Sequence, residues 1–219
     1  MADLIVGLSA ERVAANLRRV RELISDAGRD PDEVQILAAV KYLPASELPA
    51  LARGGVTLVG ENRAQQLIAK REATGDLFVW DFIGALQSRK VRDLVGRVRY
   101  IHSVDSDSAL EQLRRHGTAQ TEVLVQVNVA GEAGKAGIAP RQLPAFLARC
   151  PVRVVGLMTM PPLASDPERS RPHFARLAEL AAHHGLRHLS MGTSQDFVVA
   201  AQEGATIVRL GTTLFTGAA

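Results

Sequence analysis

The stretch Gln35-Ile-Leu-Ala-Ala-Val-Lys41 decides the fold of this chain. It is an apolar run that ends before a Tyr-Leu-Pro turn, and such a run is typical of a buried strand in a parallel sheet. Lys41 is predicted at the C-terminal tip of this strand, with its amine directed into whatever pocket the strand opens onto. The partners of this amine are therefore expected at the ends of the neighbouring strands.

Seven further segments are predicted to be strands, and helical segments alternate with them. The strands are Thr57–Asn62, Phe78–Gly84, Tyr100–Val104, Val123–Val129, Val152–Met158, His188–Met191 and Thr206–Leu210. The helical segments are Ala45–Arg53, Arg63–Glu72, Ser88–Val95, Ser106–His116, Pro140–Ala148, Pro167–His184 and Gln195–Glu203. An additional helix is predicted over Ser9–Ala27, with Ser9 as its N-cap.

Regular alternation of apolar strands with helices favours a parallel α/β architecture. Eight such units favour a closed (β/α)8 TIM barrel, which we expect to be one domain over residues 1–219 with an extra N-terminal helix. A doubly wound sheet is the alternative. It would call for Gly-x-Gly-x-x-Gly after the first strand, where this chain has Lys41-Tyr-Leu-Pro44.

Composition excludes several classes of function. The formal net charge is only +3, and the basic residues are scattered, so no nucleic-acid interface is predicted. No apolar stretch is long enough to span a bilayer, and no signal peptide is visible. The single cysteine, Cys150, rules out an internal disulfide framework and fits a reducing cytoplasm. A cytoplasmic protein that acts away from membranes is expected.

Hydroxyl and glycine residues follow the last two strands and suggest a phosphate site. Ser194 comes after the seventh strand, and Gly211 and Thr212 come after the eighth. In a closed barrel the eighth strand lies beside the first, so these residues should meet Lys41. An amine beside a phosphate site suggests pyridoxal 5′-phosphate (PLP) held as a Schiff base. Helix capping is an alternative role for Ser194 and Thr212, and it is compatible with anion binding.

Three other residues are candidates for contacts with the cofactor. Arg209 lies inside the last strand, where it could pair with an acidic residue or with the pyridine nitrogen. Asn62 could hydrogen-bond the ring oxygen or orient Lys41, or it could cap the next helix. Met158 could pack on the ring, as could Met191, or both could simply fill the core.

Two other patterns carry no site. Gly131-Glu-Ala-Gly-Lys135-Ala-Gly137 lacks the four-residue glycine gap and the hydroxyl residue of a P-loop, so it is predicted to be a mobile loop. His183, His184 and His188 lack a metal-ligand spacing with carboxylates, and no metal site is predicted.

Many segments of this chain resemble the YggS/PROSC family of pyridoxal phosphate homeostasis proteins. They span nearly the whole chain in order: Ala38–Tyr42, Gly60–Arg63, Trp80–Lys90, Ile101–Asp105, Val125–Val129, Gly131–Lys135, Gly156–Met158, Leu189–Ser194 and Val208–Thr212. Asp81, Arg89 and Thr193 depart from residues that are common in the family. These departures are expected to affect peripheral contacts and any partner surface rather than the cofactor site.

The resemblance implies a barrel of the alanine-racemase N-terminal type, which is fold type III among PLP proteins. It implies that PLP binds covalently to Lys41, with its phosphate around Ser194, Gly211 and Thr212. Such a protein would buffer PLP or deliver it to PLP-dependent apo-enzymes. No catalytic residue is assigned, and a monomer is expected.

Two enzymes remain as alternatives. A fold-type III enzyme such as an amino-acid racemase would need a second acid or base facing Lys41, and no tyrosine follows Thr212. A Schiff-base aldolase on a phosphate-binding barrel would ordinarily carry its lysine on a later strand.

Overall fold

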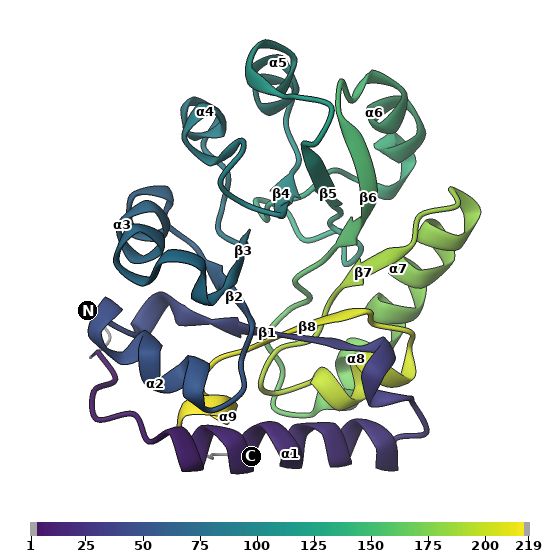
Figure 1. Cartoon of the computed structure of the whole chain (residues 1–219). Helices are drawn as coiled ribbons and strands as arrows, with labels where there is room; N and C mark the ends of the chain where they lie inside the picture. The colour runs from purple at the N-terminus through teal and green to yellow at the C-terminus, as the bar shows by residue number, and fades with distance from the viewer. Residues whose placement is uncertain (1–3, 217–219) are drawn as a thin grey trace.

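Eight parallel strands close a barrel in sequence order, as predicted (Figure 1). The computed structural model describes residues 4–216. The first three and last three residues of the predicted domain, 1–219, therefore lie outside the described range. Strand β8 pairs with β1, with Leu210 opposite Ala38, and this pairing closes the ring. The strands are β1 (Gln35–Ala39), β2 (Leu58–Glu61), β3 (Val79–Phe82), β4 (Tyr100–Val104), β5 (Glu122–Gln126), β6 (Arg153–Met158), β7 (His188–Ser190) and β8 (Ile207–Leu210).

Helices surround the barrel and connect successive strands. The α-helices are α1 (Ala10–Asp26), α2 (Leu48–Arg53), α3 (Ala64–Thr74), α4 (Val91–Leu94), α5 (Asp107–His116), α6 (Leu143–Arg149), α7 (Arg171–His183), α8 (Phe197–Gln202) and α9 (Thr212–Phe215). Short 3-10 turns cover Pro31–Glu33, Val40–Tyr42, Ala45–Glu47, Gly75–Leu77, Ser88–Lys90, Pro140–Gln142 and Pro167–Ser170. Within residues 4–216, no helix is both long and apolar enough to cross a membrane.

The extra N-terminal helix α1 lies across the outside of the barrel beside α2, α8 and α9 (Figure 1). The predicted cap is confirmed, because the Ser9 hydroxyl accepts the Arg12 amide at 3.2 Å. Val13 and Ile24 are buried on its inner face, and Asn16 donates to the Leu214 carbonyl at 3.0 Å. This contact connects α1 to the segment that follows β8.

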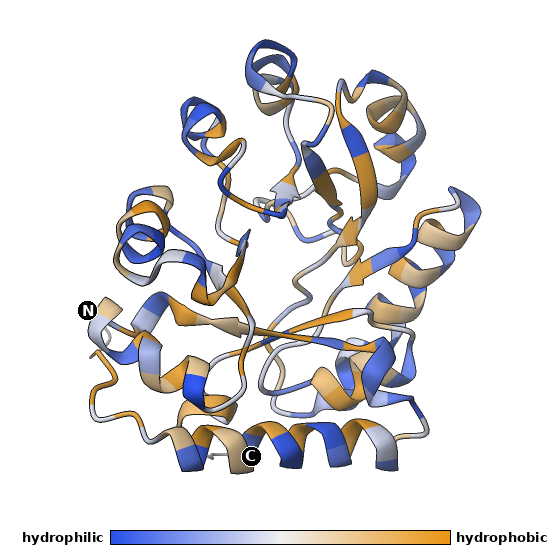
Figure 2. Ribbon diagram, in the orientation of Figure 1, coloured by the Kyte–Doolittle hydropathy of each residue, from blue (hydrophilic) through white to orange (hydrophobic). Residues whose placement is uncertain are grey.

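The barrel has an outer core and an inner core. The strands are largely hydrophobic, and the surrounding helices carry hydrophilic residues (Figure 2). The inner core packs Leu37, Leu58, Leu124, Met158 and Ile207 inside the ring. Four of the buried polar side chains are linked across the ring by contacts described below: Asp81, His102, Ser190 and Arg209.

Candidate functional site

Lys41 lies just beyond β1 rather than inside it, so the predicted strand end is wrong by two residues. The strand stops at Ala39, and Val40–Tyr42 forms a 3-10 turn in which the Leu43 amide donates to the Val40 carbonyl at 3.0 Å. The turn comes just before Pro44, which restricts the backbone of the residue ahead of it to extended conformations. Lys41 is exposed, and its Nζ lies 4.7 Å from the centre of the Tyr42 ring.

A buried ion pair behind Lys41 holds this turn. Lys70 of α3 donates to the Val40 carbonyl at 2.8 Å and to the Glu61 carboxylate at 2.5 Å. Glu61 is the last residue of β2, and its other carboxylate oxygen accepts the Asn62 amide at 2.7 Å. Sequence reasoning missed this pair. The one available signal was that Lys70 is among only four lysines in a chain rich in arginine.

The strand register brings the predicted phosphate residues to the end of the barrel where Lys41 lies. Leu210 is opposite Ala38, so Gly211 follows beside the last residue of β1. The Gly211 amide donates to the Ser194 hydroxyl at 3.4 Å, which is long for a hydrogen bond. Thr212 begins α9 and is exposed. Capping by Ser194 is wrong, because α8 has Asp196 at its N-cap position and no side-chain cap.

The loop that carries Ser194 is built by Gly192 and Asp196. Gly192 has φ of +89°, and a Cβ there would lie 2.6 Å from the Ala200 side chain, so glycine is required. Asp196 accepts both the amide and the hydroxyl of Thr193, at 2.7 and 3.1 Å, and also accepts the Ser170 hydroxyl at 2.9 Å. The departure at Thr193 therefore has a structural role in shaping this loop.

Packing within the chain does not require Gly211 to be glycine. An added Cβ would contact only the Ala39 carbonyl, at an ordinary 3.7 Å. The pairing of Ala38 with Leu210 nevertheless confirms that the two strand ends meet. A cavity of about 310 Å³ opens beside the Ser194 loop and is lined by residues that include Gln126, Lys135 and Thr193.

Arg209 of β8 is almost completely buried, and both of its terminal nitrogens make hydrogen bonds. One donates to the Ser190 carbonyl at 2.8 Å and to the Ser190 hydroxyl at 2.6 Å. The other donates to the Thr159 carbonyl at 2.9 Å and to the Met160 sulfur at 2.8 Å. Within residues 4–216 it forms no salt bridge, so the structural ion pair considered above is wrong. Burial lowers the pKa of Arg209 to about 10, and the side chain stays charged at neutral pH.

The other two predicted contact residues lie at neighbouring strand ends. Asn62 follows β2 and is half-buried, but it does not cap α3, whose N-cap position is held by Arg63. Met158 ends β6 and faces the barrel interior, whereas Met191 belongs to the outer core. Met158 thus remains a candidate for packing on a bound ring, and Met191 fills the core.

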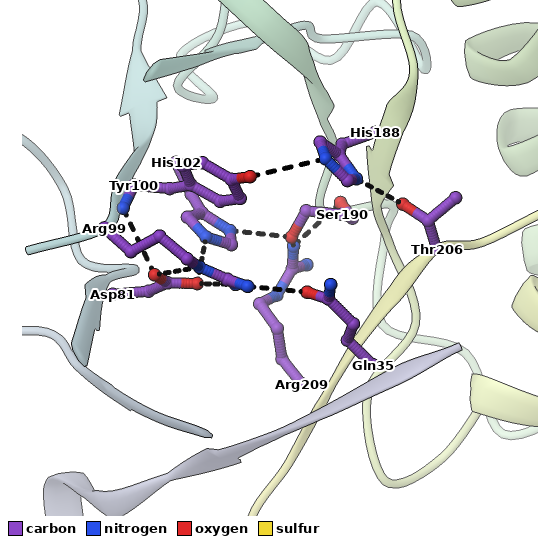
Figure 3. Close-up of polar contacts among 9 residues, drawn as sticks. All are labelled: Gln35, Asp81, Arg99, Tyr100, His102, His188, Ser190, Thr206 and Arg209. Atoms are coloured by element: carbon purple, nitrogen blue, oxygen red, sulfur yellow. Dashed lines mark hydrogen bonds and ion pairs between the residues drawn. The ribbon is translucent and has the colours of Figure 1, made fainter. Parts of the chain in front are cut away.

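Asp81 is not peripheral, contrary to the expectation from sequence. It is fully buried and accepts hydrogen bonds from Arg99 at 2.5 Å and from His102 at 3.0 Å (Figure 3). The other ring nitrogen of His102 lies 2.9 Å from the Ser190 hydroxyl. A polar chain therefore runs from Asp81 to Arg209 through residues far apart in sequence. Arg89 is exposed, as expected for a surface position.

The rejected patterns also have structural explanations. His188 begins β7 and lies 3.4 Å from the Tyr100 hydroxyl, while His183 and His184 end α7. No group of residues suited to metal binding occurs in the described part of the chain. Cys150 caps the end of α6, and burial raises the pKa of its thiol.

Acidification should destabilise the protein through His102. Burial lowers the pKa of His102, and the hydrogen bond to Asp81 offsets this only in part. The unfolded histidine binds a proton near pH 6.5, whereas the folded one resists it, so the free energy of unfolding should fall as the pH drops below that value. One proton sets a limit of about 1.4 kcal/mol per pH unit. His188, whose pKa is also lowered by burial, adds to the same trend.

Urea unfolding between pH 7 and pH 5 measures this slope. His102→Gln should flatten it, while His116→Gln on the exposed end of α5 should leave it unchanged. An identical slope in wild type and His102→Gln would show that His102 is not held neutral.

Comparison with known proteins agrees with this architecture. The family described as "Alanine racemase, N-terminal domain" matches residues 8–219. The pyridoxal phosphate homeostasis protein of Aquifex aeolicus is 39% identical over 221 residues, covering 94% of this chain and 97% of its own. That of Pseudomonas aeruginosa is 40% identical over 216 residues, covering 94% of each chain.

Solved structures extend the comparison. PipY of Synechococcus elongatus, solved with PLP bound, is 34% identical with a TM-score of 0.78, covering 93% of this chain and 99% of its own. The alanine racemase of Corynebacterium glutamicum, 16% identical with a TM-score of 0.71, shares the fold alone and covers 94% of this chain and 60% of its own. The chain belongs to the family of pyridoxal phosphate homeostasis proteins, built on the barrel of the alanine racemase N-terminal domain.

Proposed function

We propose that this protein binds PLP as a Schiff base on Lys41, and that it buffers the cofactor and delivers it to PLP-dependent apo-enzymes. The observation that carries the proposal is the β1–β8 register. It brings an exposed lysine, a charged buried arginine and the Ser194–Gly211 pair to one end of the barrel. The family's name and the PLP-bound PipY structure support it.

The residues present fit the cofactor. Arg209 has five N–H donors, and the four on its terminal nitrogens are directed at protein groups. Within residues 4–216, Nε–H is left without a partner, so it can donate to the pyridine nitrogen. The Gly211 amide and the Ser194 hydroxyl share only a long contact, which a phosphate oxygen can replace. Thr212 would add a hydroxyl, Asn62 would hydrogen-bond the ring oxygen, and Met158 would pack on the ring face.

The residues of the site are better suited to binding PLP than to catalysing a reaction with it. When bound, PLP supplies an aldehyde for the lysine and a ring that can accept electrons. Arg209 would donate to the ring nitrogen and keep it unprotonated, which would weaken the ring as an electron acceptor. Neither of the two tyrosines faces Lys41 across the site. Tyr42 shares its turn, and Tyr100 begins β4 at the opposite end of the barrel.

Removing one phosphate contact should weaken PLP binding without abolishing the Schiff base. Ser194→Ala and Thr212→Val each delete a hydrogen bond to a charged group, worth roughly 1.5–3 kcal/mol, or about one to two decades in affinity. Equilibrium titration followed by absorbance gives the dissociation constants. Plain pyridoxal, which lacks the phosphate, is the control, and these variants should bind it as the wild type does. Equal wild-type affinity for pyridoxal and PLP would refute the phosphate assignment.

The loaded protein should show negligible racemisation or decarboxylation of L-amino acids. Incubation in deuterated water with detection of deuterium at Cα tests for proton abstraction. Asp105 is an acidic residue at the same end of the barrel, since it follows β4, and burial raises its pKa. Its carboxylate accepts the Gly137 amide at 2.9 Å, so it already holds a loop. Rapid exchange that is lost in Lys41→Ala and in Asp105→Asn would identify an enzyme.

Delivery is tested by mixing the loaded protein with a PLP-dependent apo-enzyme in the presence of a reagent that traps free PLP. Activation faster than the release of PLP into buffer supports direct transfer to the apo-enzyme. If the apo-enzyme is activated no faster than PLP is released into buffer, the protein buffers PLP and does not transfer it directly.

A further inference from the structure

A chain of polar side chains crosses the interior of the barrel beneath the proposed cofactor site (Figure 3). Arg99 donates two hydrogen bonds to Asp81, at 3.0 and 2.5 Å. Asp81 lies 3.0 Å from His102 Nε2, and His102 Nδ1 lies 2.9 Å from the Ser190 hydroxyl. Ser190 in turn lies 2.6 Å from a terminal nitrogen of Arg209. His102 and Asp81 are fully buried, so the middle of this chain is shielded from water.

The donor and the acceptor of each hydrogen bond along these linked side chains can be assigned. Arg209 only donates, so the Ser190 oxygen accepts from it. The Asp81 carboxylate only accepts, so His102 donates to it from Nε2, and the neutral ring leaves Nδ1 to accept the Ser190 proton. Asp81 accepts from His102 and from both Arg99 nitrogens, which requires a carboxylate. Each of these links therefore joins one donor to one acceptor.

The electrostatics agree with this arrangement. Burial would raise the pKa of Asp81, but the hydrogen bond from His102 and the pair with Arg99 outweigh it and lower the pKa. Burial lowers the pKa of His102, and the positive charges of Arg209 and Arg99 add to this. The histidine is therefore neutral and the aspartate is charged at neutral pH.

We infer that Asp81 is a positioning residue for Arg209, acting through His102 and Ser190. The chain holds one terminal nitrogen of Arg209 in place and thereby sets the plane of the guanidinium and the direction of its Nε–H. His102 accepts the Ser190 proton only while Asp81 selects the Nε2–H form, and this hydrogen bond fixes the hydroxyl orientation in which the Ser190 oxygen accepts from Arg209. The hydrogen-bond chain needs no cofactor, whereas its consequence for the pyridine nitrogen rests on the proposed function.

Nitrogen NMR of the imidazole rings, recorded without PLP, tests the chain itself. Histidine-labelled wild type should show His102 neutral and protonated on Nε2 at pH 7. In Asp81→Leu the acceptor is gone, and the proton should move to Nδ1. Asp81→Asn keeps one acceptor oxygen but turns an NH2 group toward donors that the carboxylate accepts, so it should disturb the wild-type form as well. A charged His102 in the wild type, or an Nδ1–H form there, would overturn the inference.

A comparison of two ligands tests the consequence for Arg209. The probes are PLP and its analogue in which the ring nitrogen is replaced by C–H, which keeps the aldehyde and the phosphate. Asp81→Leu and Ser190→Ala should each weaken PLP binding about tenfold, the size of one hydrogen bond to a charged group, and should leave binding of the analogue unchanged.

Leu124→Ala is the matched control, because Leu124 is a buried residue of the same inner core without a place in the chain. It should lower stability and leave the ratio of the two affinities unchanged. If Asp81→Leu weakens both ligands equally, its role is structural only and the inference fails. If the wild type binds neither ligand, the proposed function fails, and the NMR result still decides whether the chain exists.

Discussion

Replacing Lys41 with alanine should abolish the Schiff-base absorbance and the borohydride-fixable adduct completely, while the protein stays folded. Lys41 is exposed in a turn, and its amine makes no hydrogen bond to any residue between 4 and 216. Its removal therefore leaves no buried group without a partner. Absorbance titration with PLP, reduction with borohydride and mass spectrometry of the peptides measure the loss, and circular dichroism checks the fold.

Two further variants make this test sharp. Lys41→Arg keeps the charge but cannot form an imine, so it should be as defective as alanine. Lys90→Ala removes a lysine that pairs with Asp93 at 3.3 Å and should bind PLP normally. A fixed adduct at unchanged stoichiometry in Lys41→Ala would contradict the assignment. It would direct attention to Lys135, whose side chain is 60% exposed and which lines the cavity beside the Ser194 loop.

Replacing Lys70 with methionine should lower the free energy of unfolding by about 3–5 kcal/mol, because it leaves a charged partner buried and alone. Both members of the Lys70–Glu61 pair are almost completely buried, with 6% and 1% of their side chains exposed. The Val40 carbonyl also loses its donor. Urea unfolding of the protein without cofactor measures the loss.

The double variant Lys70→Met with Glu61→Gln tests whether the unpaired buried charge causes the loss of stability. It removes the buried charge as well, so it should recover part of the stability lost in Lys70→Met. An exposed pair such as Arg19 with Glu22 should contribute less than about 1 kcal/mol when one partner is removed. A loss from Lys70→Met no larger than that would mean that the pair does not stabilise the turn.

The sequence was sufficient for the architecture because the relevant signals are local. Each apolar run such as Gln35–Lys41 carries its own evidence of a buried parallel strand, and the Ser9 cap depends only on its neighbours in sequence. The topology of a closed barrel then places all C-terminal strand ends on one side. Lys41 and Gly211 could therefore be assigned to one site before any contact was known.

The predictions were wrong where a short segment was compatible with more than one local structure. The chain leaves β1 at Ala39 because the turn before Pro44 competes with the strand for the same residues. Ser194 looked like a helix cap because it precedes a helical segment. In the structure its hydroxyl instead accepts the Gly211 amide, 17 residues away.

By itself the sequence determined the barrel, its extra helix and the end at which Lys41 meets the Ser194 and Gly211 loops. Only the tertiary structure decided which polar side chains hydrogen-bond to one another inside the barrel. His102 and Ser190 are 88 residues apart, and they meet because β4 and β7 both point these side chains into the ring at the same depth. Depth depends on the stagger of strands around the closed barrel, which no local pattern encodes. The link from Asp81 to Arg209 and the support of Lys70 behind Lys41 therefore emerge only when all eight strands are in register.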